Sequence, residues 1–296
     1  MMEKTLGGII VPVVTPFHRD ETLNERGLHR LVQYLISQGV HGIFPCGSQG
    51  EFHTLTLDER KRVLEVVIEE VDGQVLVLAH TGAITTRESI ELTKHAAAAG
   101  ADVVSLITPF YIKPTSEEIY SHYMQVAEVA TVPVMAYNNP ERTGYFMTPA
   151  ILGKLAETGA LVGMKDSSGD LGLTLAYIEA CPASFVTFVG RDTLIYPALC
   201  CGCVGAVAAT ANVAPDLAVG IYKAMQVGNH IMARELQRKL SPLRQAFTLG
   251  TFPAVIKEAL ELIGLPAGPA RSPVAPLDEA ARGELKHILS QMGKIG

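Results

Sequence analysis

The stretch QVLVLAHTGAITTRESIELTKHAAAAGADVVSLI, residues 74–107, contains the repeating unit of the predicted fold. Two short apolar and β-branched runs, Gln74–Ala79 and Asp102–Ile107, lie at its ends, and each is too short for a helix. Between them, Thr85 and the Glu three residues later form a capping box that starts an amphipathic helix, and Gly100 supplies the positive φ that ends it. The order strand, helix, strand is typical of a parallel sheet.

The same unit recurs along most of the chain. Eight runs have the composition of strands buried on both faces: Gly8–Val14, His41–Pro45, Gln74–Ala79, Asp102–Ile107, Val132–Tyr137, Leu161–Lys165, Phe185–Gly190 and Val204–Ala209. Helix starts are predicted at the capping boxes of Thr22, Thr56, Thr85 and Thr115, at Thr148-Pro149 and at Pro215. Helix ends are predicted at Gly39, Gly73, Gly100 and Gly159. Strand ends recur about every 20 to 35 residues, which predicts an α/β fold, a (β/α)₈ TIM barrel, with an open doubly wound sheet as the alternative.

After the eighth run the pattern changes to consecutive helices. Their predicted ranges are Asp216–Met225, Met232–Phe247, Ala254–Ile263 and Leu277–Met292. The first would complete the barrel, so residues 1–228 are predicted to form the barrel and residues 229–296 a C-terminal helical extension of the same domain. The extension could pack against this barrel or against another subunit.

Composition excludes several classes of protein. Hydrophobic residues make up 48% and charged residues 18%, which is enough apolar material for a large core. The net charge is −6 and the basic residues are scattered, so a nucleic-acid partner is not expected. The N-terminus lacks a signal sequence or membrane span, which predicts a cytoplasmic protein without a membrane partner. No His-x-His or His-Glu-x-x-His pair is present, so no metal is expected.

Two candidate catalytic residues end neighbouring predicted strands, and the catalytic groups of TIM barrels lie at those strand ends. Lys165 follows four uncharged residues, and partial desolvation would favour the neutral amine, which attacks carbonyl carbons. Tyr137 would lie on the same rim, where its phenol can carry protons. The plain alternatives are that Lys165 pairs with Asp166 or reaches solvent, and that Tyr137 is a core residue with a satisfied hydroxyl.

Further candidates lie in the loops that follow other strands. In Gly47-Ser48-Gln49-Gly50-Glu51 the glycines permit a tight turn whose backbone N–H groups can bind a carboxylate, with the Ser48 hydroxyl as a proton relay. Arg142 is a candidate clamp for a second carboxylate, with surface ion pairing as the alternative. Tyr111 could join the relay or cap the barrel, and His80 ends the third strand and would reach the same rim.

Taken together, these motifs resemble the dihydrodipicolinate synthase and N-acetylneuraminate lyase family of pyruvate-dependent class I aldolases. The resemblance spans the whole chain. It is carried in order by Gly47-Ser48-Gln49-Gly50-Glu51, Thr108-Pro109-Phe110-Tyr111, Tyr137-Asn138-Asn139-Pro140, Arg142-Thr143-Gly144, Gly163-Met164-Lys165-Asp166 and Thr210-Ala211-Asn212.

The resemblance implies a lyase in which Lys165 forms an imine with pyruvate, so that no separate cofactor is needed. It implies a proton relay of Tyr137 and Ser48, joined by Tyr111 from a neighbouring subunit of a homotetramer built as a dimer of dimers. The remaining implied substrate contacts are the backbone N–H groups of Ser48 and Gln49, which hold the pyruvate carboxylate, and Gly190 and Val207, which line the pocket.

The resemblance also implies a second substrate. Arg142 stands where synthases of the family hold the carboxylate of L-aspartate 4-semialdehyde, so we expect condensation of pyruvate with this aldehyde, a step of lysine and diaminopimelate biosynthesis. Gln49 in place of a Thr, Phe52 after Glu51 and His80 in place of a glycine favour the alternative, aldol cleavage of a 2-oxo-3-deoxy or N-acetylneuraminate-type sugar acid, or a related dehydration. A non-catalytic sensor of 2-oxo acids is the alternative from another class.

Overall fold

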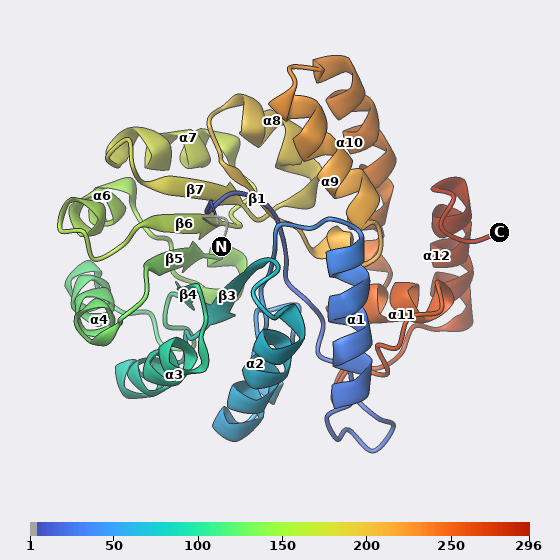
Figure 1. The fold of residues 1–296 in the computed structure, drawn as a ribbon, viewed down its shortest axis with the longest axis horizontal. Coiled ribbons are helices and arrows are strands. Elements are labelled where there is room, and N and C mark those ends of the chain that lie inside the picture. The colour runs from blue at the N-terminus through green and yellow to red at the C-terminus, as the bar shows by residue number, and fades with distance from the viewer. Residues whose placement is uncertain (1–4) are drawn as a thin grey trace.

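The computed structural model describes residues 5–296, so residues 1–4 of the predicted barrel range 1–228 lie outside the described part. Eight parallel strands form a closed barrel in chain order from β1 to β8 (Figure 1). Strand β1 pairs with both β2 and β8, which closes the sheet and leaves no free edge. The predicted TIM barrel is confirmed, and the open doubly wound sheet is wrong.

Each predicted strand coincides with an observed one, and every observed strand is shorter than its predicted range. The strands are β1 (Gly8–Val11), β2 (Gly42–Ile43), β3 (Leu76–His80), β4 (Val103–Ile107), β5 (Val134–Asn138), β6 (Gly163–Asp166), β7 (Val186–Val189) and β8 (Gly205–Val207). Nearly all their residues are buried, as expected for strands that face side chains inside the barrel and helices outside it.

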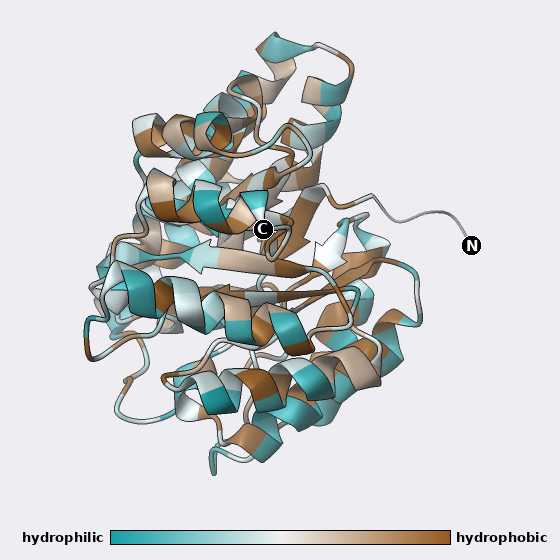
Figure 2. Cartoon of the chain, turned by 90° about the vertical axis from the view of Figure 1, so that its left-hand side faces the viewer, coloured by the Kyte–Doolittle hydropathy of each residue, from teal (hydrophilic) through white to brown (hydrophobic). Residues whose placement is uncertain are grey.

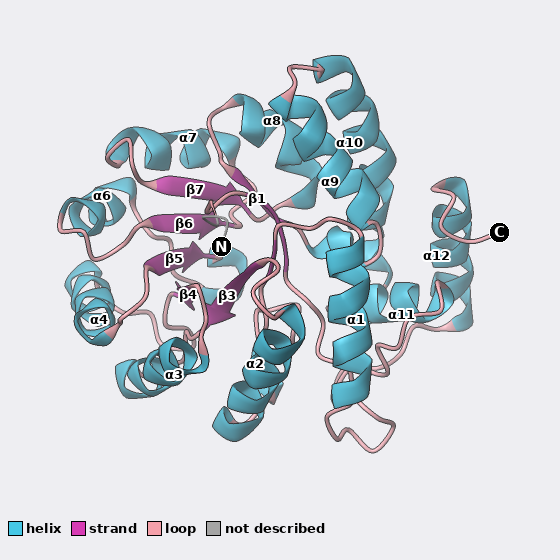
Figure 3. Cartoon of the chain, in the orientation of Figure 1, coloured by secondary structure: helices cyan, strands magenta, loops and turns pink. Residues whose placement is uncertain are grey.

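Helices surround the barrel on its outside (Figure 3). They are α1 (Glu25–Ser37), α2 (Leu57–Val71), α3 (Thr86–Ala99), α4 (Ser116–Val129), α5 (Pro140–Thr143), α6 (Pro149–Glu157), α7 (Leu171–Ala180), α8 (Ile195–Cys200) and α9 (Pro215–Gln226). Short 3₁₀ turns are η1 (Phe52–Thr54), η2 (Asp192–Leu194), η3 (Ala209–Asn212) and η4 (Ala246–Leu249). Figure 2 shows helices that carry both teal and brown residues, as amphipathic helices packed on a core do.

Most of the predicted helix boundaries are confirmed, including the positive φ of the four helix-ending glycines. The boxes at Thr56 and Thr115 make both capping bonds, while Thr85 caps its helix and donates its hydroxyl to the carboxylate of Glu88. The box at Thr22 is wrong. Helix α1 is capped instead by Asn24, which accepts from the Gly27 N–H at 2.8 Å, while the Thr22 hydroxyl bonds Asp20. Asn24 is a strong N-cap residue, so the helix starts two residues later than the box at Thr22 predicted.

The C-terminal extension consists of α10 (His230–Gln245), α11 (Ala254–Leu262) and α12 (Glu279–Gln291). Helix α10 packs on α9, and α11 packs on η3, so the extension lies against its own barrel. The division of the chain at residue 228 stays a prediction. Within residues 5–296, no helix has the length and apolar character that crossing a membrane requires.

The segment between α11 and α12 is tied to the barrel by Arg271. Its guanidinium pairs with both carboxylate oxygens of Glu59, donates to the carbonyl of Thr54 at 2.8 Å and lies over the ring of Phe17. Hydrogen bonding from Arg271, with help from Thr56, lowers the pKa of Glu59 to about 2.

Replacing Glu59 with glutamine is expected to make stability less dependent on acid pH. A carboxyl whose pKa is lower in the folded state stabilises the fold above its unfolded pKa and loses this effect as pH falls toward about 2. The pair is partly exposed, so its contribution is small. The free energy of unfolding of the wild type should exceed that of Glu59→Gln by only about 1 kcal/mol at pH 6, and this difference should shrink at pH 3. Urea unfolding at both pH values measures this, with the exposed Glu69→Gln of the same helix as control. A difference that stays constant with pH would contradict the assignment.

Candidate active site

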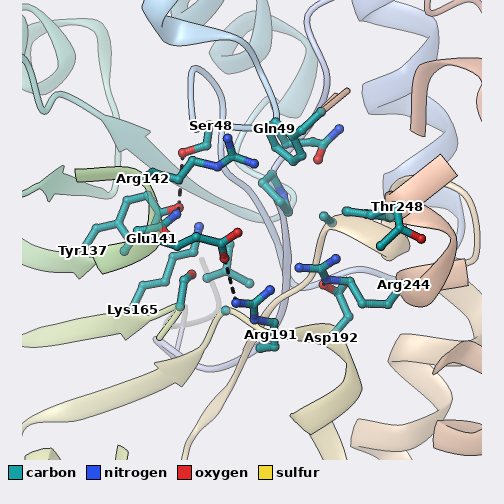
Figure 4. A pocket seen from close by; sticks show the side chains of 18 residues that line it. Ser48, Gln49, Tyr137, Glu141, Arg142, Lys165, Arg191, Asp192, Arg244 and Thr248 are labelled. Carbon is teal, nitrogen blue, oxygen red and sulfur yellow. Dashed lines mark hydrogen bonds and ion pairs between the residues drawn. The ribbon is translucent and has the colours of Figure 1, made fainter. Parts of the chain in front are cut away.

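A cavity of about 280 Å³ opens at the carboxyl ends of the barrel strands. Its wall combines residues from strand ends, such as Tyr137 and Lys165, with residues from the C-terminal extension, such as Arg244 and Thr248 (Figure 4). This is the face on which TIM barrels carry their catalytic groups.

Lys165 lies inside this cavity with 5% of its surface exposed. It pairs in register with Tyr137 of the adjacent strand, so both side chains leave the sheet on the same side. The Lys165 Nζ lies 3.8 Å from the centre of the Tyr137 ring and 4.9 Å from that of Phe44. The alternative pairing with Asp166 is not observed, because that carboxylate accepts hydrogen bonds from Asn138, Ser168 and Thr174.

The hydroxyl of Tyr137 is at the centre of a small polar network. It lies 3.3 Å from the Ser48 Oγ and accepts a hydrogen bond from the Asn139 amide at 2.9 Å. Burial raises the pKa of Tyr137, but the Lys165 charge and the bonds from Ser48 and Asn139 outweigh it, so this pKa falls below its ordinary value. A phenol held in this way can exchange a proton with a neighbouring group.

The loop at residues 47–51 places Ser48 and Gln49 in the cavity wall. The residues with left-handed backbone are Cys46, just before the loop, and Glu51, at its end, rather than the glycines. Glycine is required for a different reason, since a Cβ at Gly47 would lie 2.8 Å from the Phe44 ring. The missing side chain at Gly47 therefore lets the loop pack closely against the barrel.

Glu51 anchors this loop to the C-terminal extension through a buried ion pair. Its carboxylate lies 2.6 Å from the Lys257 Nζ of α11 and accepts from the Arg271 N–H at 3.0 Å. Burial lowers the pKa of Lys257 to about 8, although the charge of Glu51 opposes this shift. Sequence reasoning missed this pair, because Glu51 and its partners are more than 200 residues apart and no local pattern joins them.

Three arginines line the cavity. Arg142 of α5 stacks on the ring of Phe252, with its guanidinium carbon 4.2 Å from the ring centre. Among residues 5–296 it makes no ion pair within 4.0 Å, so the expected alternative of surface pairing is not observed. Sequence reasoning missed the other two, Arg191 after β7 and Arg244 of α10. Arg191 directly follows a predicted strand, a signal that could have revealed it.

Of the remaining predicted site residues, two line the cavity and one does not. Gly190 and Val207 line the cavity, and a Cβ at Gly190 would lie 3.0 Å from the Lys165 Cε, so only glycine leaves this space open. Tyr111 is 90% exposed and does not line the cavity of its own chain, so its predicted entry into a neighbouring subunit stays a prediction. Within residues 5–296 no cluster of three or more potential metal ligands is found.

His80 ends β3 as predicted, but its side chain does not line the cavity, so the expected contact with the rim of the site is wrong. Its ring packs 4.6 Å from the ring of Phe52 and 6.1 Å from that of Tyr137. The Arg60 guanidinium donates to the His80 carbonyl at 2.8 Å. Burial, with the nearby charges of Arg60 and Lys165, holds the pKa of His80 well below its ordinary value, so the ring is neutral. The residue belongs to the packing behind the site.

A closed (β/α)₈ barrel with a buried lysine and tyrosine on adjacent strand ends defines a TIM-barrel enzyme. The chain belongs to the dihydrodipicolinate synthetase family, which it matches over residues 5–292, and it is a lyase that acts on small molecules. It is 40% identical over 290 residues to a 4-hydroxy-tetrahydrodipicolinate synthase of Methanopyrus kandleri, covering 97% of each chain. The alternative of a non-catalytic sensor of 2-oxo acids finds no support in this similarity.

The chain is also similar to a second lyase sequence and to a solved structure. An uncharacterized DapA-like lyase of Halobacterium salinarum is 41% identical over 291 residues, covering 98% of this chain and 95% of the relative. The crystal structure of YagE, a prophage protein of the dihydrodipicolinic acid synthase family from E. coli K12 in complex with pyruvate, aligns with a TM-score of 0.94 at 37% identity. The alignment covers 97% of this chain and 99% of that one.

Proposed function

We propose that this lyase binds pyruvate as an imine on Lys165 and condenses it with L-aspartate 4-semialdehyde. The observation that carries the proposal is the Lys165 Nζ, buried in the cavity against the Tyr137 ring at 3.8 Å. Relatives named 4-hydroxy-tetrahydrodipicolinate synthase at about 40% identity support this aldehyde.

The proposed chemistry uses groups already in contact. The Lys165 amine attacks C2 of pyruvate, and the resulting carbinolamine loses water to give the imine. Loss of a C3 proton gives the enamine, whose C3 bonds to the aldehyde carbon while the aldehyde oxygen takes up a proton. The Tyr137 hydroxyl, next to Ser48 and Asn139, is the proposed proton carrier. The backbone N–H groups of Ser48 and Gln49 are proposed to hold the pyruvate carboxylate.

The proposed reaction needs room beside the imine carbon, and it needs no separate cofactor. Gly190 and Val207 leave room beside the imine carbon, because neither presents a long side chain. No cofactor is required, since the covalent imine itself draws electrons from C3.

Arg142→Ala is expected to raise the KM of the aldehyde by about tenfold to a hundredfold and that of pyruvate much less. The guanidinium lines the cavity and has no ion-pair partner among residues 5–296, so its fork can hold the aldehyde's carboxylate. Steady-state kinetics with each substrate varied in turn measures this, with Arg87→Ala of α3, an arginine outside the cavity, as control. Equal effects on both KM values would indicate a role in the fold only.

A second candidate function is aldol cleavage of a 2-oxo-3-deoxy sugar acid, or a related dehydration. One observation favours it: both amide atoms of Gln49 are buried at the cavity wall without a hydrogen-bond partner among the described residues. A turn of this side chain toward the cavity would let its free amide bind a hydroxyl of a sugar chain. A coupled assay with pyruvate plus aspartate semialdehyde, compared with cleavage of 2-oxo-3-deoxygluconate, decides between them. No turnover of the semialdehyde would exclude the first function.

Assembly and location remain proposals. We infer a cytoplasmic homotetramer, a dimer of dimers, in which Tyr111 enters the proton relay of a neighbour. The support is the exposure of Tyr111 together with Ile112 and Ile84, in loops that follow the adjacent strands β4 and β3. Exposed apolar side chains gathered in this way are typical of protein interfaces.

A further inference from the structure

Two neighbouring asparagines at the end of β5 make different contacts. Asn139 comes directly after β5 and two residues after Tyr137, so these two side chains leave the backbone on the same side. Asn138 lies between them, and its amide donates to the Asp166 carboxylate at 2.9 Å. Asn139 instead lines the cavity, where its amide donates to the Tyr137 hydroxyl at 2.9 Å.

The helix that follows Asn139 does not use its side chain. An asparagine at the N-cap of a helix normally accepts a hydrogen bond from a backbone N–H of the first turn. At the start of α5 the Asn139 side chain accepts none, and the backbone N–H groups of Arg142 and Thr143 donate to the Asn139 carbonyl. The side chain is buried, and its amide bond is made with the phenol rather than with the helix.

This contact restricts the direction of the hydrogen bond between Tyr137 and Ser48. Among residues 5–296, the Tyr137 hydroxyl bonds the side chains of Ser48 and Asn139, and by geometry alone either oxygen of the Ser48 pair could be the donor. An amide N–H only donates, so Asn139 cannot accept the phenol hydrogen. The hydrogen of Tyr137 is therefore directed to the Ser48 Oγ, 3.3 Å away (Figure 4).

The same contact favours the ionised form of the phenol. An N–H that donates to an oxygen stabilises that oxygen more when it carries a negative charge. Burial raises the pKa of Tyr137, while the charge of Lys165 and then the bonds with Ser48 and Asn139 lower it below its ordinary value. The other charged or titratable groups around the phenol and its cavity are Lys165 of β6, the neutral His80 of β3, and Glu141 and Arg142 of α5.

We propose that Asn139 is a positioning residue of the proton relay, which directs the Tyr137 hydrogen to Ser48 and holds the phenolate after a proton has left. This inference rests on the proposed function, because Tyr137 is the proton carrier of that reaction. Tyr137 gives a proton to the hydroxyl of the carbinolamine, the C2–O bond breaks, water leaves, and the nitrogen lone pair forms the protonated imine. The phenolate, bonded by Asn139, then takes a proton from C3 to give the enamine, which restores the phenol.

The ionisation of Tyr137 can be measured at the ζ-carbon of ¹³C-labelled tyrosine. Its NMR signal moves when the phenol ionises, and Tyr137→Phe shows which of the nine tyrosine signals belongs to Tyr137. In Asn139→Val, which has no polar side-chain atom, the pH midpoint of this signal is expected to rise by about 1 to 2 pH units. Gln125→Leu, which removes an exposed amide from α4, is the matched control and should keep the wild-type midpoint.

The direction of this change tests the contact itself. A midpoint that falls in Asn139→Val would mean that the amide oxygen, and not the N–H, faces the phenol, and an unchanged midpoint would mean that the contact has no effect. Either result would overturn the proposal. Asn139→Ala, whose smaller side chain cannot overpack the site, is the second variant, and its midpoint should also rise.

Exchange of the pyruvate methyl protons with D₂O measures the relay without any second substrate. At neutral pH the maximal exchange rate is expected to fall about tenfold in Asn139→Val, while the pyruvate concentration for half-maximal exchange changes about twofold or less. The pH profile of exchange should shift in the same direction as the NMR midpoint. A lower rate with an unmoved pH profile would indicate a role in the fold only.

Borohydride trapping separates failure of this inference from failure of the proposed function. If the wild type forms no adduct with pyruvate, the proposed function is removed. If Asn139→Val forms the adduct and keeps the wild-type midpoint and exchange rate, the role of Asn139 is removed and the proposed function stands.

Discussion

Lys165→Ala is expected to abolish the covalent adduct that borohydride traps between the protein and pyruvate. The Lys165 Nζ is the amine that the barrel places in the cavity, next to the Tyr137 ring and behind the loop at residues 47–51. Without the imine, no enamine forms, so lyase activity should fall by more than about a thousandfold. Intact-protein mass spectrometry after reduction measures the adduct, and peptide mapping identifies the modified lysine.

The control for this experiment is a lysine outside the cavity. Lys154 lies on the exposed side of α6 against the ring of Tyr120, so Lys154→Ala should retain both adduct and activity. An adduct that persists in Lys165→Ala and maps to another lysine would show that the nucleophile is assigned to the wrong residue. Lys257 would then be the first to examine, because burial lowers its pKa to about 8.

Lys257→Met is expected to lower the free energy of unfolding by about 3–5 kcal/mol. The substitution leaves the carboxylate of Glu51 buried, and within residues 5–296 the Arg271 backbone N–H is then its one hydrogen-bond donor. Urea unfolding measures the loss. The KM for pyruvate should also rise, since Glu51 fixes the loop that presents Ser48 and Gln49 to the cavity.

A second variant separates loss of the charge pair from loss of packing. In Glu51→Gln/Lys257→Met no uncompensated charge remains, so most of the lost stability should return. Lys61→Met, which breaks the more exposed pair with Glu91, should cost about 1 kcal/mol or less. A Lys257→Met variant no less stable than Lys61→Met would show that the buried pair is not important for the fold.

The features predicted from sequence are those with a local cause. A strand buried on both faces requires consecutive apolar residues, and a helix start requires a cap, so the eight strands and most helix boundaries could be located. Lys165 and Tyr137 could be found because each ends such a strand, and the carboxyl ends of all barrel strands meet at one face.

Features that depend on distant contacts could not be predicted. Arg244 lies in a predicted helix and Phe252 in the turn before α11, neither of them in a motif, and only the packing of the C-terminal extension on the barrel brings them to the cavity. His80 shows the opposite error, because it was predicted to reach the site and does not. The prediction rested on its place at the end of a strand, which it shares with Lys165. Its ring is instead held behind Tyr137 by contacts with Phe52 and Arg60.

The C-terminal extension forms part of the cavity wall, so bond formation and the choice of aldehyde depend on different segments of the chain. The strands hold Lys165 and Tyr137, the proposed nucleophile and proton carrier. Arg244, Phe247 and Phe252 of the cavity wall lie beyond the last strand. Exchange of the segment after α9 between members of the family would therefore change which aldehydes are accepted and leave the bond-forming amine in place. New selectivities can arise in this fold by recombination at one junction, without rebuilding the barrel.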